Sequence, residues 1–78
     1  MLTQDEIDKA QAELDAKVQE LRKVIQREVP YIDRKQYSHN IITVCLQEVA
    51  KVAGKKVANG LIDEFYLEPL GWSKQNVN

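Results

Sequence analysis

The chain of 78 residues has very little of several residue types on which common protein functions depend. It holds one cysteine and one histidine, Cys45 and His39, so it can form no disulfide within the chain and offers no credible zinc-ligand set. Its longest apolar run, residues 41–46, is far shorter than the roughly 20 residues of a membrane-spanning helix. Because no nucleophile is paired with a base, the sequence indicates no enzyme and no cofactor.

Charge of one sign is also lacking, because 11 basic and 12 acidic residues leave a net charge of −1. Domains that bind nucleic acid usually carry a basic excess, so this balance argues against nucleic-acid binding as a general property of the chain. The first ten residues are acidic and polar, unlike a secretory signal, and a single thiol is typical of a reducing compartment. We therefore expect a cytoplasmic protein that does not associate with membranes.

The composition that remains is that of a small folded domain. Apolar residues make up 44% of the chain and charged residues 29%, which is typical of a globular protein. A core of this size usually contributes only about 3–5 kcal/mol of stability, so a partner subunit is the stabilising supplement that the sequence leaves available. We predict one helical domain over residues 1–72 and a disordered polar tail over residues 73–78.

The first 29 residues carry the clearest pattern in the chain, that of an amphipathic helix. Apolar residues recur at spacings of three and four, at Ile7, Ala10, Leu14, Val18, Leu21, Ile25 and Val29. Thr3 followed by Glu6 has the spacing of a capping box, and Pro30 ends the helix because it excludes its preceding residue from the helical region.

Two shorter helices follow a loop over residues 30–37. Ser38 is a candidate N-cap for the second helix, and Gly54 is a natural residue to follow its last turn. The third helix is expected over residues 55–65, with Gly60 inside it as a sign of close backbone packing. The predicted fold class is all-α, a long N-terminal helix followed by two shorter helices in a three-helix hairpin or bundle.

The three predicted helices differ in length, at roughly 39, 24 and 17 Å. The short helices should pack on the C-terminal half of the long one and leave the apolar stripe of its N-terminal half uncovered. We predict that this stripe is a dimer or partner interface formed by Ile7, Ala10, Leu14 and Val18. An acidic first half and a basic second half of the helix favour an antiparallel homodimer, and a helix of a different protein is the alternative occupant.

A second candidate surface for a protein partner combines aromatic and basic side chains. Its members are Tyr31, Tyr37, Tyr66, Trp72, Arg34 and Lys35. The favoured interpretation of these rings is that they close one end of a small core. A partner-binding patch is the alternative, because tyrosine and tryptophan dominate binding hot spots. Ordinary solvated charge is the favoured interpretation of the two basic residues of this patch. The alternative is that they approach Lys55 and Lys56 in one basic patch, if the loop lies near the corner between the second and third helices.

Residues 46–65 have the rhythm of a degenerate helix-turn-helix, whose candidate nucleic-acid contacts are Lys55, Lys56 and Asn59. However, Lys55 stands where such motifs usually carry an apolar plug, and the acidic pair Asp63 and Glu64 would repel phosphates. We therefore predict a small non-enzymatic interaction protein, an adaptor or inhibitor that acts as a dimer on another macromolecule. The alternative is a small DNA-binding regulator.

Overall fold

The computed structural model of the chain describes residues 1–76. Three α-helices, α1 (Gln4–Glu28), α2 (Ser38–Ala53) and α3 (Lys55–Glu64), are joined by short segments that include the 3-10 helices Val29–Tyr31 and Glu68–Leu70. Helix accounts for 75% of the structure, and no strand occurs within residues 1–76. The predicted all-α class, with one long helix followed by two shorter ones, is confirmed. The dimer stays a prediction.

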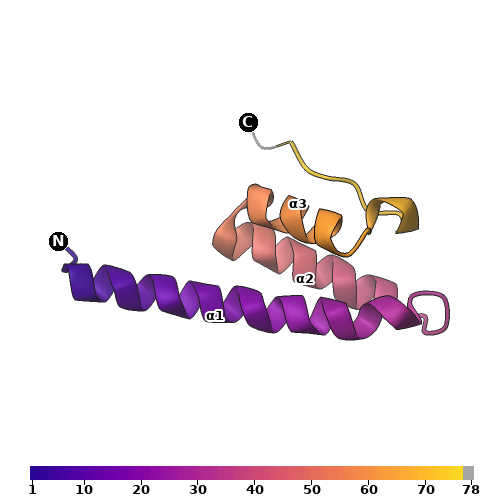
Figure 1. The fold of residues 1–78 in the computed structure, drawn as a ribbon, viewed down its shortest axis with the longest axis horizontal. Coiled ribbons are helices and arrows are strands. Elements are labelled where there is room, and N and C mark those ends of the chain that lie inside the picture. Colours follow the sequence, from indigo (N-terminus) through magenta and orange to yellow (C-terminus); the bar gives the residue numbers. More distant parts are fainter. Residues whose placement is uncertain (77–78) are drawn as a thin grey trace.

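Helices α2 and α3 form a hairpin that lies along only one end of α1 (Figure 1). α2 packs against α1, and α3 runs back along α2. The N-terminal half of α1 extends beyond the hairpin, which gives the molecule extents of 48 × 27 × 16 Å. The predicted mismatch in length is present, because helices of 16 and 10 residues pack on one of 25.

The capping box at the start of α1 is present as predicted. The backbone N–H of Glu6 donates to the Thr3 hydroxyl at 3.2 Å, and the Thr3 N–H donates to the Glu6 carboxylate at 3.4 Å. These bonds satisfy two groups at the helix start that would otherwise have no partner within the helix. At the other end, α1 gives way to the 3-10 helix that contains Pro30.

The core lies between the C-terminal half of α1 and the hairpin. Its buried apolar residues are Ile25, Ile42, Cys45, Leu46, Val49, Ala58, Leu61, Ile62, Leu67 and Trp72. The segment after α3 supplies two of them, Leu67 and Trp72, and so completes the core. On the surface, Arg22 of α1 forms an ion pair with Glu64 of α3 and lies 5.6 Å from the ring centre of Phe65.

Ser38 does not cap α2, so that prediction is wrong. Tyr37 occupies the N-cap position, and Ser38 is the buried first residue of the helix. Its hydroxyl donates to the buried carboxylate of Glu28 at 3.3 Å, and Arg27 Nε lies 3.8 Å from the same carboxylate. A buried carboxylate needs hydrogen-bond donors, and this requirement outweighs the capping preference of serine.

The two glycines of the hairpin have different roles. Gly54 joins α2 to α3 with a φ of 98°, a value that glycine adopts without strain, and the predicted break at this residue is confirmed. Gly60 is exposed, and a Cβ added to it would meet nothing within 4 Å. The predicted close packing at Gly60 is therefore wrong.

The C-terminus of α3 is a Schellman motif built on a tyrosine. The N–H of Leu67 donates to the carbonyl oxygen of Ile62 at 2.9 Å, and the N–H of Tyr66 donates to that of Asp63 at 3.3 Å. Tyr66 adopts the left-handed φ of 54° that the motif requires. The motif reverses the chain and directs Leu67 into the core, where it is fully buried.

Candidate protein-binding surface

The stripe of Ile7, Ala10, Leu14 and Val18, called the α1 stripe below, lies mostly on the part of α1 that the hairpin leaves uncovered. We define residues 4–17 as the free half of α1, and every residue in it is exposed. Ile7 is 47% exposed and Leu14 is 40% exposed, whereas Val18 is half-buried. The structure thus places apolar side chains of the stripe in solvent.

The α1 stripe leads into a groove of about 470 Å³ between α1 and the corner at which α2 meets α3, called the corner groove below. Its apolar lining residues are Leu14, Val18, Val52, Ala53 and Val57. Val57, near the start of α3, is 39% exposed. Sequence reasoning missed this groove, because its two walls come from residues more than 30 positions apart.

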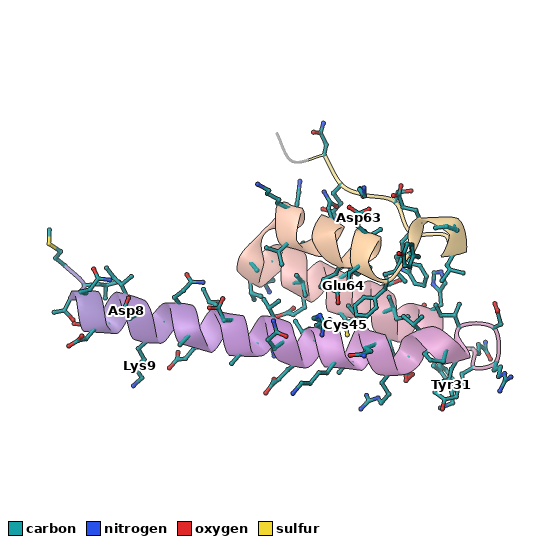
Figure 2. All side chains as sticks on the ribbon, viewed as in Figure 1. Asp8, Lys9, Tyr31, Cys45, Asp63 and Glu64 are labelled. Atoms are coloured by element: carbon teal, nitrogen blue, oxygen red, sulfur yellow. The ribbon has the colours of Figure 1, made fainter. Side chains whose placement is uncertain are left out.

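Three lysines flank the corner groove in the sequence, and we call them the lysine corner. Lys51 precedes Val52 at the end of α2, while Lys55 and Lys56 open α3, and all three lysines are exposed. Within residues 1–76 the ion pairs involve Arg22, Arg27 and Lys74 and leave the lysine corner without an acidic partner. Acidic residues gather instead in the first two turns of α1, at Asp5, Glu6 and Asp8. Figure 2 shows Asp8 on the part of α1 that extends beyond the hairpin.

The aromatic members of the second candidate surface differ in exposure. Tyr31, Tyr37 and Tyr66 are exposed at 38%, 71% and 78%. Trp72 is only 8% exposed, because its ring stacks on His39 with centroids 4.1 Å apart and its indole N–H donates to the Thr43 hydroxyl at 3.1 Å. Trp72 therefore closes the core, and the tyrosines are the exposed rings of this candidate surface.

The basic residues of the loop and of the hairpin corner do not converge. Arg34 and Lys35 precede α2, whereas Lys55 and Lys56 follow it, and 16 helical residues, or about 24 Å, separate the two pairs. Lys35 lies over the ring of Tyr31, with its Nζ 4.3 Å from the ring centre. The interpretation of the four residues as one basic patch is wrong.

A shallow hollow of about 300 Å³ lies on the first half of α2. Its lining residues are Tyr37, Asn40, Ile41, Val44 and Cys45. Val44 is 62% exposed, and sequence reasoning missed it as a surface feature. The sequence held one indication of this exposure. Val44 belongs to the apolar run 41–46, and a helix that buries one face cannot bury every residue of a continuous run. Cys45 itself is buried, and burial raises the pKa of its thiol.

The geometry of residues 46–65 differs from that of a helix-turn-helix. α2 and α3 are joined by Gly54 alone and lie side by side, whereas the motif uses a turn of three or four residues between crossed helices. The side chain of Asn59 is bound to the backbone of Gln75 by two hydrogen bonds, each of 2.8 Å. Of the candidate nucleic-acid contacts, Lys55 and Lys56 remain exposed.

The C-terminal tail was predicted to be disordered over residues 73–78, of which residues 77 and 78 lie outside the described residues. Lys74 Nζ lies 2.6 Å from the Asp63 carboxylate and 3.5 Å from that of Glu68, and the hydrogen bond with Asp63 raises the pKa of the lysine. The tail therefore has partners on α3 through Lys74 and Gln75. Its disorder stays a prediction.

The described residues hold no group of three or more His, Cys, Asp or Glu side chains that could bind a metal ion. None of the helices described is both long and apolar enough to cross a membrane. The chain matches no protein-family model, no curated protein and no solved structure. Fold and surface define an all-α three-helix protein in which the N-terminal half of the longest helix is uncovered.

Proposed function

We propose that this protein is a small non-enzymatic helical interaction protein, an adaptor or inhibitor, that acts by binding another protein chain through the free half of α1. The exposure of Ile7 and Leu14, at 47% and 40%, carries this proposal. Isolated helices of about 12–15 residues are marginal in water, so a projecting helix of this length gains stability when its apolar face is covered.

The corner groove supports binding better than catalysis. Its polar lining residues are Gln11, Asp15 and Gln19, so the groove offers one carboxylate and two amides. Acid-base catalysis usually needs two titratable groups whose environments separate their pKa values, and such a pair is missing from this lining. Apolar walls open to solvent instead suit an apolar side chain presented by a partner.

Two further features belong to the proposal. A cytoplasmic location is supported by the single Cys45, because secreted domains of this size usually depend on disulfides.

A DNA-binding regulator is the weaker candidate function. The side chain of Asn59 is bound to Gln75, and α2 and α3 lack the crossed arrangement of a helix-turn-helix.

Photo-crosslinking in the cell from which the chain comes tests the proposed function. A photoreactive amino acid replaces Leu14 in one version and Lys23, which is exposed on the covered half of α1, in the matched control. We expect a discrete protein adduct from position 14, either with a second copy or with a foreign protein, and much less adduct from position 23. Equal or absent adducts at the two positions would contradict the proposal.

A further inference from the structure

The α1 stripe and the corner groove together form one continuous, elongated apolar surface that is uncovered in the single chain. It begins at Ile7, passes Leu14 and ends in the corner groove between Val18 and Val57. The free half of α1 is about 21 Å long at 1.5 Å per residue. An occupant must therefore present apolar groups over a similar length, and a helix with apolar residues every three or four positions does so.

The free half of α1 is itself a helix of that length and pattern. When two copies lie antiparallel about a two-fold axis, the N-terminal end of each stripe meets the corner-groove end of the other. The partner copy's Ile7 then approaches Leu14 at the edge of the corner groove, and the two Ala10 side chains lie near the centre of the overlap. A two-fold contact of this kind closes on itself and leaves no further stripe exposed.

The charges distinguish this arrangement from its alternatives. In the antiparallel pair the acidic residues Asp5, Glu6 and Asp8 of one copy approach the exposed lysine corner of the other, which has no acidic partner within residues 1–76 of its own chain. A parallel pair would place the acidic turns against each other. A foreign basic helix would suit the acidic turns but would be repelled at the lysine corner, and an acidic helix would meet the opposite conflict.

We propose that a second copy of this chain occupies the α1 stripe, in an antiparallel two-fold dimer in which the acidic first turns of each α1 dock on the lysine corner of the other. This inference rests on the proposed function, since it names the occupant of the same surface. It also assigns Lys51, Lys55 and Lys56 to protein contact rather than to nucleic acid.

Sedimentation of the purified full chain gives the first test. We expect a species of twice the 9.0 kDa chain mass at tens of micromolar, and we expect it to dissociate when Leu14 is replaced by aspartate. A native monomer at these concentrations would overturn the inference. If position 14 nevertheless crosslinked to a foreign protein in the cell, the proposed function would stand and only the second copy would be excluded.

Two complementary charge variants test the arrangement. One carries Lys55→Glu with Lys56→Glu, and the other carries Asp5→Lys with Asp8→Lys. Each should self-associate at least about tenfold more weakly than the native chain at low salt, because like charges then face each other. An equimolar mixture should recover the dimer, since each variant supplies the charge that the other needs. The matched control, Lys23→Glu with Arg34→Glu, reverses two exposed charges outside the interface and should dimerise normally.

Disulfide trapping checks the same geometry with uncharged changes, in case lysines near the helix start loosen α1. Ala10→Cys lies near the proposed two-fold axis and should link to its copy under mild oxidation, whereas Leu2→Cys should not. The native Cys45 is buried and stays in place. Efficient linkage of Leu2→Cys, or a dimer that ignores both charge variants and is not restored by mixing, would overturn the antiparallel docking.

Discussion

The side-chain amide of Asn59 binds the backbone of Gln75 on both its polar groups. It donates to the carbonyl oxygen and accepts from the N–H, each at 2.8 Å. This pair holds Gln75 alongside α3, and the ion pair between Lys74 and Asp63 adds a second attachment. Because a hydrogen bond contributes about 0.5–1.5 kcal/mol net, the pair is strong enough to order a short segment but weak compared with the core.

Replacing Asn59 with alanine should therefore release the tail and leave the fold intact. Hydrogen exchange followed by NMR should show faster exchange of the Gln75 amide, while amides in the middle of α2 keep their protection. Gln47→Ala, an exposed change on α2, is the control and should leave the tail unaffected. If the Gln75 amide exchanges equally fast in the native chain and in Asn59→Ala, the tail is disordered as the sequence predicted.

Gly60→Ala should stabilise the protein by about 1 kcal/mol, because alanine is the better helix former and the position has room for a Cβ. Gly54→Ala is the matched comparison. It should be destabilising, because a φ of 98° is strained for any residue with a side chain. Urea unfolding measures both changes. A loss of stability in Gly60→Ala would show that the glycine has a packing role after all.

Tyr66 offers a test of backbone strain at the Schellman motif. Its φ of 54° costs about 1–2 kcal/mol for residues other than glycine, so Tyr66→Gly should raise the midpoint of thermal unfolding. Tyr66→Ala removes the same 78% exposed ring but keeps the Cβ, and should give no such gain. The difference between the two variants, rather than either value alone, isolates the strain. Equal midpoints would indicate that the left-handed conformation is not occupied in solution.

The features that the sequence predicted correctly are those set by near neighbours along the chain. The capping box joins Thr3 to Glu6, the periodicity of α1 repeats within two turns, and the break at Gly54 follows from one residue. Each of these involves separations of four residues or fewer, over which the geometry of a helix is known in advance. The uncovered free half of α1 also followed, because helix lengths alone determine how much of α1 the hairpin can reach.

The features that the sequence did not reveal depend on distant pairs. Ser38 bonds to Glu28 across a loop, and Trp72 bonds to Thr43 across 29 positions. Whether a serine caps its own helix or satisfies a buried carboxylate depends on the path of the loop, which periodicity does not encode. For the same reason the sequence did not predict the corner groove. Its walls contain Leu14 and Val57, which come together only through the packing of the hairpin on α1.

The thiol of Cys45 provides a final prediction, which concerns alkaline pH. Burial raises its pKa, a nearby Arg27 opposes this shift, and Glu28 adds to it. In the unfolded chain the thiol ionises near its ordinary value of about 8.5, and in the folded chain it resists ionisation to a higher pH. The neutral thiol therefore contributes a stabilisation that is fully present below about pH 8.5 and is lost as the pH rises through the folded pKa.

Comparison with Cys45→Ala separates this contribution from other groups that titrate at high pH. The difference in unfolding free energy between the native chain and Cys45→Ala, measured in urea, should be constant near neutral pH and should shift against the native chain above about pH 8.5. Lys74 titrates in both proteins, so its effect cancels in the difference. A thiol reagent should react slowly with the folded protein and rapidly in urea. A difference that does not change with pH, together with rapid labelling of the folded protein, would show that Cys45 is accessible to solvent.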